Sequence, residues 1–382
     1  MRTGLLPAGK RPALALGSVI RWTEVVARRL ERSSLSQRAG ELVDTVSVMG
    51  GVQAQLQSSA ELQLASRVDG LAQAEVRAAL WERRELVKAW TLRGTLHLHP
   101  AGELSLWHAA KRAVTAEDQS LPAWRDPNGN DHPPLDAEQV AAVRAAVRDV
   151  LDGRCLLREE IAGEVVARVG PAPRARLASG FAFFLGDLCQ GPPRGAKVTF
   201  ARPDQWVDGW SEPDASDALR EACRRFLFAY GPARPKDFLE WFGGSRAPFE
   251  EIDIDEVDVE GRSAFVLAGD TVFPDAGKSV RLLPEYDAYV MGFRERDQLI
   301  PPAVRAQVAA HGRGRYEGPA GVRFLLVDGV TAGTWSRAKR GRRFEVEVAP
   351  IRTVTKRERA ELQTEVARLG AFLGLEPVLR IA

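Results

Sequence analysis

The chain has 382 residues, of which 45% are hydrophobic and 27% charged, the composition of a globular protein with enough apolar residues for a large core. The net charge of +2 does not by itself indicate a nucleic-acid binder, and no apolar run approaches the length of a membrane span. Cys155, Cys189 and Cys223 are widely spaced and form no CxxC pair, so neither a disulfide framework nor a structural zinc site is expected.

Residues 1–18 contain basic residues together with Leu and Ala, but Pro7, Gly9 and Pro12 interrupt them. This segment lacks the continuous apolar stretch of a signal peptide. We therefore expect a disordered leader and a cytoplasmic protein.

Residues 19–120 are expected to form a first winged-helix module. Apolar residues recur at helical spacing three times, and two alternating segments then follow across a turn at Leu92-Arg93-Gly94, the pattern of a β-hairpin. The expected helices cover 37–49, 60–66 and 72–84, and the expected strands cover 86–91 and 95–99.

The same order of helices and strands recurs twice, which predicts a second module at 135–212 and a third at 213–270. A proline-rich loop at 121–134 separates the first two. The second module is expected to have helices at 136–151, 158–169 and 174–189, a turn at 190–195 and a strand at 197–201; the third has helices at 214–230 and 235–242 and strands at 256–260 and 263–267.

Residues 271–382 show the alternating apolar pattern of β-strands, followed by an amphipathic helix expected at 356–373. Asp328-Gly329 between alternating segments is a strong hairpin signal, which predicts strands at 324–327 and 330–335 and a third at 344–348. The sequence therefore predicts an α+β protein made of three tandem winged-helix modules and a small C-terminal β domain.

Gly51-Val52-Gln53-Ala54-Gln55-Leu56-Gln57 places neutral amides at alternate positions between two expected helices. In an extended backbone Gln53 and Gln55 face the same way. Two amides on one side can hold a water molecule, because each supplies a donor and an acceptor. The alternative is that these glutamines are solvated residues of a polar loop.

Basic residues concentrate in two expected hairpins. The tip at 336–343 contains Arg337, Lys339, Arg340, Arg342 and Arg343, while Arg194 and Lys197 lie in the second module. Such residues are suited to bind phosphate groups, although a solvated turn would look the same.

Two further groups have open interpretations. Asp287, Arg294 and Arg296 follow a Leu-Leu-Pro motif and either support the active site or form a structural ion pair. His97 and His99 alternate on one expected strand without an evident third ligand, so we interpret them as wing or core histidines and expect no metal.

Six motifs in order resemble the winged-helix family of bacterial DNA glycosylases typified by AlkZ and YcaQ, and the resemblance covers the chain from about Val19 onward. Members carry either Gln-apolar-Gln or Gln-apolar-Asp as a catalytic motif, and Gln53-Ala54-Gln55 matches the first, a branch associated with unhooking interstrand crosslinks and protecting producers of DNA-alkylating natural products. The motifs are 51–55, 87–97, 191–195, 230–233, 282–287 and 329–335.

The resemblance implies a DNA glycosylase that requires no cofactor and acts on double-stranded DNA, expected here as a monomer. A glutamine does not titrate and cannot protonate a poor leaving group, so the expected substrates are purines already activated by alkylation at N7, including crosslinked ones. The absence of an evident lysine beside Gln53 and Gln55 favours a monofunctional enzyme over a Schiff-base lyase. The alternatives are a winged-helix transcriptional regulator, which would need a dimer and a palindromic site, and a protein-binding scaffold.

Overall fold

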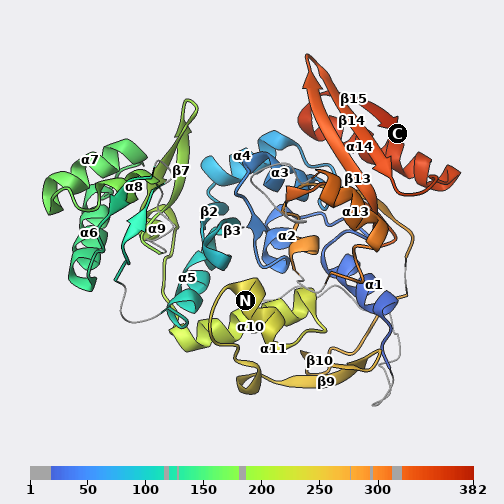
Figure 1. Cartoon of the computed structure of the whole chain (residues 1–382), viewed down its shortest axis with the longest axis horizontal. Helices are drawn as coiled ribbons and strands as arrows, with labels where there is room; N and C mark the ends of the chain where they lie inside the picture. The colour runs from blue at the N-terminus through green and yellow to red at the C-terminus, as the bar shows by residue number, and fades with distance from the viewer. Residues whose placement is uncertain are drawn as a thin grey trace.

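The protein has a mixed α+β architecture in the computed structural model, which describes residues 19–115, 120–126, 129–179, 186–275, 277–292, 296–311 and 321–382. The expected leader at 1–18 lies outside the described residues. Within the described ranges, no helix is long and apolar enough to cross a membrane. Figure 1 shows a central and a left-hand part that share one sheet, helices below them, and the C-terminal sheet at the upper right.

The first part of the chain forms helices followed by an antiparallel hairpin, as the sequence predicts. The short strand β1, which falls between two helices, pairs antiparallel with β3, and β3 pairs with β2. The elements are α1 (Trp22–Arg32), α2 (Leu42–Val48), β1 (Val52–Gln53), α3 (Gln57–Ala65), α4 (Gln73–Trp81), β2 (Leu86–Trp90), η1 (Leu92–Gly94), β3 (Leu96–Pro100), η2 (Ala101–Glu103) and α5 (Leu104–Arg112).

The second part repeats this order, because its first strand β6 also falls between two helices and pairs with the last strand β8. Its sheet joins that of the first part through the register pair Lys88↔Gln190, giving the strand order β1-β3-β2-β7-β8-β6. The elements are β4 (Trp124–Arg125), β5 (Asp131–His132), α6 (Ala137–Val150), β6 (Leu156–Leu157), α7 (Arg158–Val169), α8 (Arg174–Ser179), β7 (Cys189–Arg194), β8 (Lys197–Ala201) and α9 (Pro203–Trp206).

The prediction of a helix over 174–189 followed by a turn over 190–195 is wrong where the two segments meet. Cys189 begins strand β7, which continues through Arg194. Cys189 is fully buried and pairs with Ala201, so tertiary packing determines the strand there. Pro192 and Pro193 coincide with an irregular register between Gly191 and Arg194, which agrees with the inability of proline to donate to a ladder.

The third part has two helices below the shared sheet and a two-stranded hairpin (Figure 1). An isolated antiparallel bridge joins Ala233, between the two helices, to Phe265 in the last strand. The aromatic core of this part includes Trp241, Phe242 and Trp107. The elements are α10 (Ala215–Tyr230), α11 (Pro235–Phe242), η3 (Phe249–Glu251), β9 (Ile254–Val259) and β10 (Arg262–Leu267).

The C-terminal sheet has the order β11-β12-β13-β14-β15. Strand β13 continues through Arg340 and β14 begins at Arg343, so most of the basic residues expected in a turn lie on strands of a long hairpin. The sequence also missed β15, which pairs in parallel with β14 after the crossover helix α14. The elements are β11 (Val280–Leu283), α12 (Ala288–Met291), α13 (Pro302–His311), β12 (Phe324–Val327), β13 (Val330–Arg340), β14 (Arg343–Pro350), α14 (Lys356–Leu373) and β15 (Glu376–Ile381).

One hydrophobic cluster joins this sheet to the first part of the chain. Leu62 and Leu64 of α3 belong to the same buried cluster as Leu362 and Val366 of α14. The first part and the C-terminal sheet therefore form a continuous core around α3, the helix that follows the two candidate glutamines.

Candidate active site

The candidate motif begins where Gly51 leads the chain into strand β1. Gly51 has a φ of +103°, and a Cβ at this position would collide with the imidazole ring of His99. Only glycine allows both the conformation and the close approach. The result is that Val52 and Gln53 enter the sheet at its outer edge, in register with Leu98 and His97.

Gln53 is a buried residue whose amide is held by an arginine from the β2–β3 turn. Arg93 donates from Nη2 to Oε1 of Gln53 at 3.5 Å and also donates to the backbone oxygen of Trp241 in α11. Arg93 itself has a φ of +54°, and the Cα of Arg93 lies against Gly243 closely enough that a Cβ there would clash. The sequence placed Arg93 in a turn but assigned it no role.

Gln55 is exposed and lies two residues beyond Gln53, directly before Leu56 and the start of α3 at Gln57. Its Oε1 accepts a hydrogen bond of 3.3 Å from the backbone N–H of Leu96 in β3, and the neighbouring Ala54 N–H donates to the oxygen of Leu96 at 2.7 Å. Both candidate glutamines therefore have amide oxygens anchored to the β2–β3 hairpin, and each amide retains one oxygen lone pair and its NH2 hydrogens.

The histidines beside this motif are neutral. His97 is 1% exposed, and burial together with the nearby Arg93 guanidinium lowers its pKa to about 3. His99 is also buried with its pKa well below the usual value, and its Nε2 lies 2.8 Å from Oγ1 of Thr91. These are core histidines, as the sequence suggested, and neither can supply a proton near neutral pH.

A buried polar network links Gln53 to the Leu-Leu-Pro motif. Asp287 forms a two-pronged ion pair with Arg67, at 2.7 and 2.9 Å, and both side chains are at most 1% exposed. Arg67 also donates to the backbone oxygen of Gln63 at 3.0 Å. The Gln63 amide donates to the backbone oxygen of Gln53 at 3.2 Å and accepts from the Ala288 N–H at 3.1 Å.

Asp287 is thus paired with Arg67 in the turn after α3, which matches the structural ion pair that the sequence left open as one of two roles. Arg296, which the sequence grouped with Asp287, donates from Nε to the backbone oxygen of Val290 at 3.2 Å. Arg294 lies outside the described residues. Arg67 and Gln63 were missed because they contact Asp287 and Ala288 from more than 200 positions away.

The β13–β14 hairpin presents its basic residues in two ways. Lys339, Arg340, Arg342 and Arg343 are exposed near its tip, and Arg340 lies 3.2 Å from Glu345. Arg337 instead lies at the base of the hairpin with an 18% exposed side chain, and burial lowers its pKa.

Arg337 connects the hairpin to the site. It donates from Nη2 to Oγ of Ser58 in the first turn of α3 at 3.2 Å and lies 3.9 Å from Glu285. Glu285 also forms a two-pronged pair with Arg323, at 3.0 and 2.8 Å, and its backbone oxygen accepts from the Ser59 hydroxyl. Arg337 therefore helps to fix the helix that follows Gln55.

The basic residues of the second hairpin are paired within the protein. Arg194 lies 2.7 Å from Glu160, and Lys197 contacts Glu159, both in the first turn of α7. These four side chains are all well exposed, so the pairs are weak and can exchange with phosphates.

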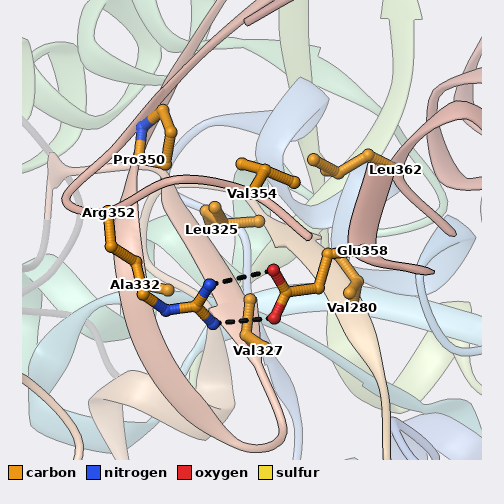
Figure 2. Close-up of a pocket in the computed structure, with 9 residues that line it drawn as sticks. All are labelled: Val280, Leu325, Val327, Ala332, Pro350, Arg352, Val354, Glu358 and Leu362. Carbon is orange, nitrogen blue, oxygen red and sulfur yellow. Dashed lines mark hydrogen bonds and ion pairs between the residues drawn. The ribbon is translucent and has the colours of Figure 1, made fainter. Parts of the chain in front are cut away.

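A small pocket beneath α14 is unrelated to the glutamines. It is lined by apolar residues such as Val280, Leu325 and Leu362, with the Arg352–Glu358 ion pair beside them (Figure 2). Its free volume of about 10 Å³ has room for about one water molecule. A purine cannot enter it.

Among the described residues, no group of three or more His, Cys, Asp or Glu side chains is arranged to hold a metal ion. The three cysteines are free, and Cys189 and Cys223 are buried. The candidate site consequently consists of amides, an arginine and neutral imidazoles.

Comparison with known proteins places the chain in a known class. A profile of the AlkZ-like DNA glycosylase family matches residues 46–372, and the chain belongs to that family. It is 29% identical over 336 residues, covering 82% of this chain and 87% of the relative, to a Streptomyces sahachiroi protein named interstrand DNA cross-link repair glycosylase. The solved structure of Streptomyces sahachiroi DNA glycosylase AlkZ superimposes with a TM-score of 0.77 at 27% identity, covering 96% of this chain and 100% of that one.

Proposed function

We propose that this protein is a monofunctional DNA glycosylase that hydrolyses the N-glycosidic bond of N7-alkylated purines, including purines joined in interstrand crosslinks. The observation that carries the proposal is the pair Gln53 and Gln55, held at the sheet edge by Arg93 and Leu96 in a protein of the AlkZ-like family. The Streptomyces sahachiroi relative is named for interstrand crosslink repair, which is the basis for including crosslinked substrates.

The architecture supports DNA binding by three winged helices. Each of the first three parts places a strand or bridge between two helices and pairs it with the last strand of its own hairpin, through β1 with β3, β6 with β8, and Ala233 with Phe265. This strand order is typical of winged helices. We propose module boundaries at 19–120, 135–212 and 213–270, with the C-terminal β domain at 271–382.

In this mechanism the two amides position a water molecule on C1′ of the deoxyribose. The water oxygen bonds to C1′ as the C1′–N9 bond breaks, and the bonding electron pair neutralises the positive charge of the N7-alkylated purine. The departing base is neutral, so it needs no protonation, and the water loses its proton to solvent. The protein contributes orientation, which lowers the entropic cost of bringing water to the sugar.

The residues around Gln53 restrict the substrate range. His97 lies in register with Gln53 and is neutral, so it cannot act as a general acid for an unmodified purine. Lys88 is buried with a pKa lowered to about 8, but it pairs with Leu98 and so lies on the opposite face of the sheet from His97 and Gln53, where its Nζ donates to the Gln57 side-chain oxygen at 3.0 Å. This placement favours simple hydrolysis over a Schiff-base lyase.

Access to the site suits a base that cannot leave the duplex. Gln55 is exposed, while Gln53 is buried on an outer strand of the sheet, so a lesion tethered to both strands would be held against this edge beside Gln55 and not inside an enclosed pocket. We propose that Lys339, Arg340, Arg342 and Arg343 of the β13–β14 hairpin contact the DNA backbone, with Arg194 and Lys197 of the second module contributing after exchange from Glu160 and Glu159. We expect a monomer in the bacterial cytoplasm, with a role in repair or in self-resistance to a DNA-alkylating product.

The test is a denaturing-gel assay for abasic sites in duplex DNA that contains one N7-methylguanine, with and without an interstrand crosslink. Gln53→Ala and Gln55→Ala should each lower the single-turnover rate on the order of 10²–10³-fold, the usual effect of losing one preorganised polar contact. Gln205→Ala, at an exposed glutamine of α9, is the matched control and should retain the wild-type rate.

Each result has a definite meaning. Excision that survives both substitutions would retain the glycosylase and discard the two glutamines as its site. Tight DNA binding without excision of either lesion would instead support a winged-helix regulator, and sequence-dependent footprints would then be expected.

A further inference from the structure

Leu56 is an apolar residue exposed between polar residues of the candidate motif. It is 38% exposed, one of four large hydrophobic residues so exposed among the described residues. Gln55 before it is exposed, the Gln57 oxygen after it accepts from Lys88 Nζ at 3.0 Å, and Ser58 accepts from Arg337. Leu56 belongs to none of the hydrophobic clusters formed by the described residues around it.

The backbone that carries Leu56 is firmly held. Leu56 is the N-cap residue of α3, and its carbonyl oxygen accepts from the N–H groups of Ser59 and Ala60 at 3.0 and 3.2 Å. Every residue from Ser59 to Ala65 is buried. The side chain is therefore presented from a rigid helix end, not from a loose loop.

Leucine at this position is unfavourable for the fold. The N-cap preferentially carries Ser, Thr, Asp or Asn, whose side chains accept from the helix N–H groups, and leucine is among the poorest residues there. The Leu56 side chain makes no capping hydrogen bond. Leucine here departs from the local rule for helix caps, and such departures are expected at functional sites.

Building on the proposed glycosylase function, we propose that Leu56 inserts into the base stack of the duplex beside the lesion, as an apolar wedge. Proteins that distort duplex DNA insert Leu, Ile, Met or Phe side chains between base steps and separate them. Leu56 follows Gln55 directly and has an extended backbone, with φ −107° and ψ 114°. Insertion would open the step next to the damaged nucleotide and bring its sugar toward the two amides, without requiring the base to leave the duplex.

The experiment uses the full-length protein and a duplex in which 2-aminopurine neighbours N7-methylguanine. The fluorescence of 2-aminopurine rises when the base is unstacked, so a rise after the protein is mixed with the duplex reports insertion. The same reaction mixture also gives the single-turnover excision rate. Leu56→Ala should abolish the fluorescence rise and lower the excision rate on the order of 10- to 100-fold, the equivalent of burying one leucine side chain. Because alanine and leucine are similarly poor N-caps, the fold should be unaffected.

Three comparisons isolate insertion from other effects. Leu56→Met retains an apolar wedge and should keep both signals. Val272→Ala removes an exposed apolar side chain elsewhere and should change neither. Placing the lesion opposite an abasic analogue, where less stacking opposes opening, should restore excision by Leu56→Ala.

The wedge would be overturned if Leu56→Ala kept the full fluorescence rise, or if wild-type protein bound the duplex tightly without any rise. A rise in the wild type without excision would contradict the proposed glycosylase function but leave the wedge supported, so the two failures are distinguishable.

Discussion

Arg93 donates a hydrogen bond to the side-chain oxygen of Gln53 from 40 residues further along the chain, and the same guanidinium donates to the backbone of Trp241. A single arginine in a left-handed turn thus connects the edge strand β1 with helix α11. The orientation of the Gln53 amide depends on how that turn folds as well as on its own strand.

We expect Arg93→Ala to lower the single-turnover excision rate by about 10²-fold, because small misplacement of a positioning group has effects of this size. Arg93→Lys should also lose activity, since an ammonium is a compact charge that does not reproduce the planar fork of the guanidinium. The measurement is the excision rate at saturating enzyme, together with the DNA dissociation constant. Full activity of Arg93→Lys would mean that charge, not orientation, is what Arg93 contributes.

The Asp287–Arg67 pair should be a major determinant of stability. Asp287→Asn leaves the Arg67 guanidinium buried without its counter-ion, which typically costs about 3–5 kcal/mol. The double variant Arg67→Met, Asp287→Leu removes both charges and should be more stable than Asp287→Asn. Urea denaturation of the wild type, the single variants and the double variant measures the coupling, and single-variant losses below about 1 kcal/mol would contradict this assignment.

Stability should fall in mild acid because three histidines are buried in the neutral form. Burial is the main cause that lowers the pKa of His97 and of His108 to about 3, and that of His99 well below its usual value. The unfolded chain binds these protons below a pKa of about 6.5 while the folded chain does not, so stability is fully present above pH 6.5 and is lost as pH falls toward 3.

At pH 5, His97 and His108 should each cost about 2 kcal/mol relative to pH 7.5, or about 4 kcal/mol together, and His99 acts in the same direction. Chemical denaturation at the two pH values measures this difference. A His108→Leu variant should lose about 2 kcal/mol of the pH dependence, and an unchanged free energy of unfolding between pH 7.5 and 5 would disprove the neutral assignment.

Binding to undamaged duplex DNA should depend on the tip of the β13–β14 hairpin. Replacing both Lys339 and Arg342 by Ala should reduce the slope of log affinity against log salt by about 1.8, since each phosphate contact contributes about 0.9. The matched pair Arg194→Ala, Lys197→Ala should have a smaller effect, because these cations first have to leave Glu160 and Glu159. Fluorescence anisotropy across a salt series distinguishes the two surfaces, and equal slopes for both variants would contradict the difference.

Local sequence patterns predicted much of the fold. Helices α7, α11 and α14 begin and end at the expected residues, because their periodicity agrees with the packing around them. The prediction was wrong where long-range contacts determine the secondary structure, as at Cys189. It was incomplete at β15, because a parallel strand depends on pairing with a strand far away in the sequence.

The candidate site also contains some residues that the sequence could indicate and others that it could not. Gln53 and Gln55 could be proposed from their alternation and from the family resemblance, but the roles of Arg93, Gln63 and Arg67 arise only when the chain folds. Leu56 could not be distinguished from a core leucine by sequence, since the neighbouring Leu62 and Leu64 are fully buried.

The shared sheet ends on both sides in very short strands, with β1 and β6 only two residues long. An exposed strand edge invites another chain to add to it, and natural proteins limit this danger by keeping such edges short or covered. At β1 the Gln63 amide already occupies the backbone oxygen of Gln53. The protein can therefore display a sheet edge to an incoming duplex while giving other polypeptides little to pair with, which protects it from aggregation through the same surface that we propose for catalysis.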